Sequence, residues 1–152
     1  MNTATAVERK RKTGPKANLA IIEARLNDYN QLGLARENTL QAWRAHYPEQ
    51  YSLILERLAK EGVFFDYNST RILHATRVRR GKCHSASVEY YREQANSRVI
   101  MVGVAHYANW VVHTWIRLKS DQTLYETTGL PYHAYFGVPL TEDEAETLWL
   151  FY

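Results

Sequence analysis

The sequence predicts an α+β fold, with helices first and an antiparallel sheet after them. Apolar residues recur at helical spacing through the first 60 or so positions. From residue 63 onward, short runs rich in β-branched and aromatic residues read as strands. The 152 residues, 45% of them hydrophobic, suit one compact domain with a core. One further helix, at residues 83–95, is expected to pack on the sheet.

The N-terminal part divides into a basic arm and a helical region. Residues 1–16 are polar and basic, which predicts a disordered arm. Residues 17–62 are expected to form helices at 17–29, 36–47 and 49–60. The third helix follows Pro48 and ends before Gly62. The buried positions predicted for the first and third helices are Leu19, Ile22, Leu26, Tyr29, Ile54, Leu55 and Leu58.

Residues 63–152 are expected to form the α+β core. Strands at 63–67 and 71–76, joined at Asn68-Ser69, predict a hairpin. The further strands are expected at residues 98–105, 111–118, 124–127 and 134–138. A last helix, at 142–151, follows Thr141 with Glu three positions later, a capping-box pattern.

Three residue types of this core together suggest catalysis. Cys83 is the only cysteine, His113 follows on a predicted strand, and Glu126 lies on the next predicted strand. An imidazole within hydrogen-bond reach activates a thiol. A carboxylate on the other ring nitrogen fixes the tautomer and stabilises the imidazolium. We therefore interpret them as nucleophile, general base and orienting acid, with Asp121 a poorer substitute for Glu126.

The local sequence places these residues for such a role. Gly81 gives a flexible entry to the 83–95 helix, so Cys83 stands at a helix N-terminus, where the dipole favours a thiolate. In the strand 111–118, His113 and Trp115 point one way. If neighbouring strands pair, His113 and Glu126 meet across the sheet.

This order resembles the core of the transglutaminase-like branch of the papain-like cysteine enzymes. The matching residues, between about 80 and 138, are Gly81-x-Cys83, Val102-Gly103, His113-x-Trp115 and Glu126-Thr127. The resemblance implies a cysteine protease, amidase, deamidase or transglutaminase acting on a protein, peptide or other amide through Cys83, His113 and Glu126. The family usually has Asp as the acid and a longer Cys-to-His segment. The small size would suit a phage or bacterial accessory protein.

Four further residues are candidates for lining the site. Trp115 would shield it or contact substrate, and His84 would assist the Cys83 backbone N–H in holding an oxyanion, as Lys82 also could. Arg79 and Arg80 would make the surroundings of the thiol electropositive, which lowers its pKa and attracts acidic or phosphate-bearing substrates.

Several classes of protein are disfavoured by composition. A single cysteine cannot form an internal disulfide, which fits the cytoplasm. No stretch approaches the length of a membrane span, and the N-terminus lacks the apolar segment of a secretory signal. No paired Cys/His motif predicts zinc, and no P-loop or dinucleotide fingerprint occurs. We expect neither metal nor cofactor.

A second hypothesis is a small nucleic-acid-binding or regulatory protein with an inert thiol-fold body. The helices after the arm would form a helix-turn-helix with Gly33 in the turn and residues 37–46 as reader. The net charge of +3 permits phosphate contacts without requiring them. The candidate contacts in the arm are Arg9, Lys10, Arg11, Lys12 and Lys16.

Overall fold

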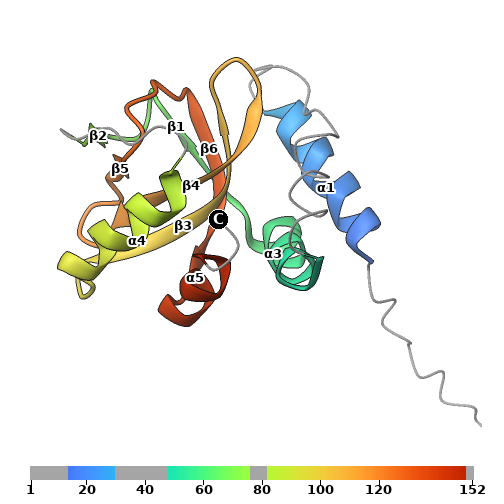
Figure 1. Ribbon diagram of the computed structural model, residues 1–152. Helices are drawn as coiled ribbons and strands as arrows, with labels where there is room; N and C mark the ends of the chain where they lie inside the picture. Colours follow the sequence, from blue (N-terminus) through green and yellow to red (C-terminus); the bar gives the residue numbers. More distant parts are fainter. Residues whose placement is uncertain (1–13, 30–47, 76–81, 150–152) are drawn as a thin grey trace, which may run out of the picture.

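The computed structural model describes residues 14–29, 48–75 and 82–149, which form helices packed on a curled six-stranded sheet (Figure 1). The helices are α1 (Pro15–Asp28), α3 (Pro48–Glu61), α4 (Cys83–Glu93) and α5 (Glu142–Trp149). The strands are β1 (Val63–Asp66), β2 (Ile72–His74), β3 (Arg98–His106), β4 (Trp110–Leu118), β5 (Leu124–Glu126) and β6 (Ala134–Leu140). The α+β class is as predicted. None of the described helices has the length and apolar character to cross a membrane.

The sheet is mixed, so the prediction of an antiparallel sheet was wrong in one pairing. The strand order is β1-β6-β3-β4-β5-β2. Four pairings are antiparallel, whereas β2 runs parallel to β5, with Ile72 opposite Leu124 and His74 opposite Glu126.

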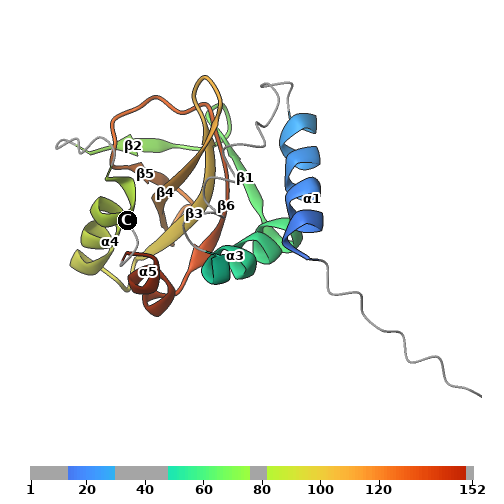
Figure 2. The same cartoon turned by 45° about the vertical axis from the view of Figure 1, so that its right-hand side comes forward.

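The predicted hairpin between the first two strands was also wrong. β1 pairs with β6 and β2 with β5, so these strands form the two edges of the sheet. The chain between them turns at Asp66, whose backbone oxygen accepts from the N–H groups of Ser69 and Thr70 and whose carboxylate accepts from Asn68. The short crossing, residues 67–71, is possible because the sheet curls and brings its edges together (Figure 2).

Side chains alternate between two sides of the sheet. The helix-facing side carries Ile100, Val102 and Val104 of β3 in one buried cluster with residues of α1, α3, α4 and α5. The opposite side, called here the aromatic side, is filled mainly by Phe65, Met101, Ala105, Trp115, Leu124, Tyr132 and Tyr135. The helices therefore all lie on one side, and the aromatic side is filled by residues of strands and loops.

The helices begin and end much as their sequences indicate. α1 and α3 bury the apolar positions that were predicted, apart from Tyr29, which is half-buried. The capping box of α5 forms: Glu144 N–H donates to Thr141 Oγ1, and Thr141 N–H donates to Glu144 Oε1. α1 includes Pro15 and Lys16, the last two residues of the predicted arm. The predicted 36–47 helix and the Gly33 turn lie outside the described residues.

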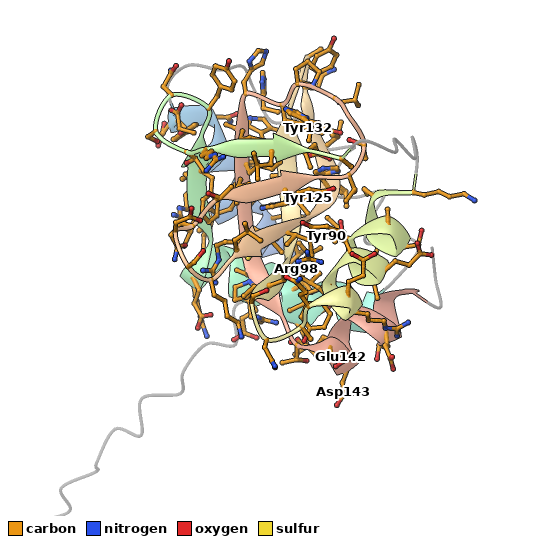
Figure 3. All side chains as sticks on the ribbon, turned by 90° about the vertical axis from the view of Figure 1, so that its left-hand side faces the viewer. Tyr90, Arg98, Tyr125, Tyr132, Glu142 and Asp143 are labelled. Atoms are coloured by element: carbon orange, nitrogen blue, oxygen red, sulfur yellow. The ribbon has the colours of Figure 1, made fainter. Side chains whose placement is uncertain are left out.

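α4 is fastened to the sheet by a stack of planar side chains (Figure 3). The ring of Tyr90 lies 3.8 Å from that of Tyr125 on β5, with an interplanar angle of 2°. The guanidinium of Arg98 lies 3.5 Å from the centre of the Tyr90 ring and donates to the Tyr90 carbonyl. These contacts fix the helix whose first residue is Cys83.

Candidate functional site

The site lies where β5 separates from β4. The two strands pair at Ile116–Tyr125 and Arg117–Leu124, and the described ladder stops there. In an antiparallel strand the N–H and C=O of one residue face the same neighbour, so both groups of Thr114 face the gap. The first turns of α4 occupy it: Ser87 Oγ donates to Thr114 O at 3.2 Å, and Thr114 N–H donates to the Cys83 sulfur. The helix thus replaces the missing strand partner.

The sulfur of Cys83, the imidazole of His113 and the carboxylate of Glu126 form a connected series. His113 Nε2 lies 2.8 Å from Glu126 Oε2 and 3.0 Å from Oε1. Because Nε2 is bound to the carboxylate, Nδ1 is the atom left for the hydrogen bond with Cys83. His113 and Glu126 are buried, whereas Cys83 is partly exposed. The structure therefore brings together the three residues on which the sequence-based mechanism depends.

Glu126 is held by three hydrogen-bond donors besides His113. Thr128 donates to Oε1 through its N–H at 3.0 Å and its hydroxyl at 2.8 Å. Tyr135 donates its hydroxyl to Oε2 at 2.8 Å. A carboxylate bound this way stays ionised in spite of full burial. Sequence reasoning missed Thr128 and Tyr135 as site residues. Thr128 could have been found from the sequence, because a Thr two positions after a carboxylate often donates to it. Tyr135 could not, because only the packing of β6 near β5 places its hydroxyl at Glu126.

Mutual contacts shift the pKa values of all three groups toward an ion pair. Burial alone opposes ionisation of Cys83, but the hydrogen bond and charge of His113, with Thr114 N–H, outweigh it and lower the thiol pKa. Burial likewise opposes the imidazolium, yet Cys83 and Glu126 raise the pKa of His113 to about 9. Burial is again outweighed at Glu126, where His113 and Thr128 lower the carboxyl pKa. The contacts of the three groups therefore favour the thiolate of Cys83 and the imidazolium of His113 over the neutral pair.

Aromatic rings enclose the imidazole. Tyr132, from the β5–β6 connection, lies 4.5 Å from His113, and Trp115 lies 6.0 Å away and nearly parallel to it. Both rings are buried. Burial, the largest cause, and the nearby Glu126 carboxylate raise the pKa of Tyr132 to about 12, so its hydroxyl stays neutral. Trp115 therefore lies beside the imidazole, and its shielding of the site stays a prediction.

Both ring nitrogens of His84, predicted as a residue lining the site, take part in hydrogen bonds between elements of the fold. Its Nε2 donates to Ala145 O at 2.8 Å, and its Nδ1 accepts from Thr114 Oγ1 at 3.1 Å. Burial lowers its pKa, so the ring is neutral. His84 thereby joins α4, β4 and α5 on the helix-facing side of the sheet.

The other candidates are separated from Cys83, His113 and Glu126, called here the triad, or lie outside the described residues. Asp121 is exposed in the turn beyond the far end of β4, where it accepts from Thr123 N–H, so it does not replace Glu126. Lys82 caps α4 and is exposed. Arg79 and Arg80 fall outside the described residues, as do Arg9, Lys10, Arg11 and Lys12 of the arm, whereas Lys16 is exposed on α1. Among the residues described, no cluster of three His, Cys, Asp or Glu side chains could hold a metal ion.

Ser87→Ala tests the docking of α4 in the gap. The variant leaves the buried Thr114 carbonyl without its hydroxyl donor, and we expect a loss of about 1–3 kcal/mol in the free energy of unfolding. The alkylation rate of Cys83 should fall as well, because the helix end loosens. Urea unfolding and iodoacetamide kinetics measure the two effects. Ser85→Ala is the matched control, because the hydrogen bond that Ser85 Oγ makes among the described residues goes to the Lys82 carbonyl of its own turn. Equal behaviour of the two variants would contradict the role of Ser87.

Comparisons with known proteins give no assignment. No protein-family model, no curated protein and no solved structure matches this chain. The fold and the site define an α+β protein with a curled mixed sheet, in which a partly exposed Cys83 is followed by the buried His113 and Glu126.

Proposed function

We propose that this protein is a cysteine-dependent acyltransferase or hydrolase acting on an amide-like bond in a protein, peptide or related substrate. The observation that carries the proposal is the placement of the His113 imidazole between the Glu126 carboxylate and the Cys83 thiol. Such a series supplies a nucleophile, a proton carrier and a group that orients the carrier. The resemblance to transglutaminase-like enzymes is part of the proposal and leads to the same assignment.

The proposed reaction proceeds through a thioester. The Cys83 thiolate attacks the carbonyl carbon, and the His113 imidazolium gives its proton to the leaving amine as the C–N bond breaks. Water or a second amine then attacks the thioester while neutral His113 accepts the proton. The C–S bond breaks, and Cys83 leaves as the thiolate. The buried Glu126 carboxylate stabilises the imidazolium in the resting enzyme and after the second attack.

The start of α4 supports a place for the developing oxyanion. The N-cap residue Lys82 makes no side-chain cap hydrogen bond. The first N–H groups of a helix have no partner within the helix. When the Cys83 sulfur attacks a substrate carbonyl, the backbone N–H of Cys83 is thus suited to donate a hydrogen bond to the carbonyl oxygen.

The pH dependence of Cys83 alkylation by iodoacetamide tests this function. Because the thiol pKa is lowered, the wild-type rate should stay high well below pH ~8.5, the ordinary thiol value. His113→Ala removes the imidazolium, so the same rate should require pH ~8.5 or above. Mass spectrometry of the alkylated protein measures both profiles.

A histidine outside the triad provides the control. His133→Ala removes an exposed imidazole and should leave the wild-type profile unchanged.

Amide cleavage or transfer should decline above pH ~9, because His113 then loses the proton that the leaving amine needs. An ordinary or unreactive thiol in the wild-type protein would sink the activated-thiol mechanism. The nucleic-acid hypothesis stays a prediction about the arm and residues 30–47.

A further inference from the structure

Three loops meet at the end of the sheet nearest His113. They are the β1–β2 connection at residues 67–70, the β3–β4 turn at 107–109 and the β5–β6 connection at 127–133. Hydrogen bonds join them: Tyr67 N–H donates to His133 O at 3.0 Å, and His133 N–H donates to His106 O at 2.8 Å. In Figure 3, Tyr132 of this group lies at the opposite end of the molecule from Glu142 and Asp143 of α5.

Aromatic contacts lead from the triad to the surface at this end. Tyr132 lies 4.5 Å from His113, and the ring of Tyr107 lies 6.5 Å from Tyr132, edge to face. The ring of His133 lies 6.5 Å from Tyr107, nearly parallel to it. The Tyr107 side chain is 48% exposed although its ring contacts the buried Tyr132. A ring that is held in place and still open to solvent is a suitable contact for another apolar group.

Val111 extends this surface along β4. It lies two residues before His113, so the two side chains point to the same side, roughly 7 Å apart along the strand. Val111 is 38% exposed, whereas His113 is buried. We name Tyr107, Val111, Tyr132 and His133 the loop-end surface.

The three loops that contribute to the loop-end surface carry no charged residue. Segments 67–70, 107–109 and 127–133 read YNST, YAN and TTGLPYH, with no Asp, Glu, Lys or Arg. Charged residues make up 23% of the whole chain, so the lack of charge is local. An acidic or basic substrate side chain placed against these loops would lose hydration and meet no opposite charge within the three segments.

We propose that the loop-end surface binds an aromatic or branched apolar side chain of the substrate, next to the carbonyl that Cys83 attacks. This inference rests on the proposed function and adds the substrate class. The reacting carbonyl has to lie beside Cys83 and His113, so the adjoining part of the substrate reaches Tyr107 and Val111. The assignment differs from the acidic substrate predicted from Arg79 and Arg80.

Substrate-like chloromethyl ketones test the proposal without a known substrate. Benzyloxycarbonyl-Phe and benzyloxycarbonyl-Glu chloromethyl ketones alkylate a thiolate by forming a C–S bond and releasing chloride. Each second-order rate is divided by the iodoacetamide rate of the same protein, which corrects for thiol reactivity. We expect the Phe compound to react about tenfold faster than the Glu compound.

The double variant Tyr107→Ser/Val111→Ser should lose most of that preference while its iodoacetamide rate stays at the wild-type value. Leu53→Ser is the matched control, because it removes an exposed apolar side chain from α3, away from the site, and should keep the preference. The inference would be overturned, with Cys83 shown to be activated by the iodoacetamide assay, by any of three results. These are equal rates for the two ketones, a faster rate for the Glu compound, or a preference for Phe that the double variant keeps. An unactivated Cys83 in the iodoacetamide assay would overturn the proposed function, and the substrate inference with it.

Discussion

Glu126→Gln is expected to slow alkylation of Cys83 at pH 7 by about tenfold or more. Glutamine has nearly the size of glutamate, so the change removes the charge and leaves the volume. Without the carboxylate the pKa of His113 falls from about 9, and the thiolate loses its paired imidazolium. Each unit by which the thiol pKa then rises reduces the thiolate fraction about tenfold while the thiol is mostly protonated.

The same variant should also be less stable. The carboxamide nitrogen is a donor, and it faces groups that donate: His113 Nε2, Thr128 or the Tyr135 hydroxyl. Breaking a buried charge pair costs about 3–5 kcal/mol. Urea unfolding measures this loss, and iodoacetamide kinetics from pH 5 to 9 measure the reactivity.

Two substitutions separate charge from geometry at Glu126. Glu126→Asp keeps the charge but shortens the side chain, so its alkylation rate should lie between those of wild type and Glu126→Gln. Glu93→Gln neutralises an exposed carboxylate that pairs with Arg98 at 3.5 Å and should change stability by less than about 1 kcal/mol. Wild-type reactivity in Glu126→Gln would show that Glu126 does not stabilise the imidazolium.

Gly103→Ala is expected to prevent stable folding. Gly103 lies in β3 between His113 of β4 and Gly137 of β6. A Cβ atom there would lie 2.7 Å from Gly137 Cα and closer still to Phe136 O. Both obstacles are backbone, so no side-chain rotation relieves the overlap. We expect a loss of about 4 kcal/mol or more, seen as lost circular dichroism or a collapsed urea midpoint.

Gly14→Ala is the matched control for this prediction. An added Cβ at Gly14 would meet no heavy atom within 4 Å. Gly14 is the N-cap of α1, where alanine is a poorer residue, so a cost of up to about 1 kcal/mol is expected. A Gly103→Ala protein as stable as Gly14→Ala would show that β3 and β6 are not packed as closely as described.

Gly137 has a related role beside the site. A Cβ on Gly137 would lie 2.8 Å from Trp115 Cζ2, so the missing side chain provides the space for the indole. Trp115 in turn lies parallel to the ring of His113. Gly137, opposite Gly103 of β3, therefore allows the Trp115 indole to lie close to β6 on the aromatic side, whereas Gly103 allows the backbones of β3 and β6 to approach closely.

The sequence by itself determined the local elements and the three residues of the triad. Periodicity placed the described helices and strands to within a few residues, because an amphipathic helix and a half-buried strand each repeat their apolar positions at a fixed interval. The types of Cys83, His113 and Glu126, and their places at a helix start and on strands, were visible for the same reason. The contacts of His84 with Thr114 and Ala145 were not visible in the sequence, because adjacency to Cys83 says nothing about direction, and in a helix the next side chain points about 100° away.

Only the tertiary structure decided which strands pair and what surrounds the triad. The turn at Asn68-Ser69 looked like a hairpin, yet the curl of the sheet gave β1 and β2 different partners, at opposite edges. The gap at Thr114 arises because β5 leaves β4 for β2, and no local pattern records where a ladder stops. Tyr135 reaches Glu126 only through the non-local pairing of β3, β4 and β6. Such contacts join residues far apart in sequence, so periodicity and propensity carry no information about them.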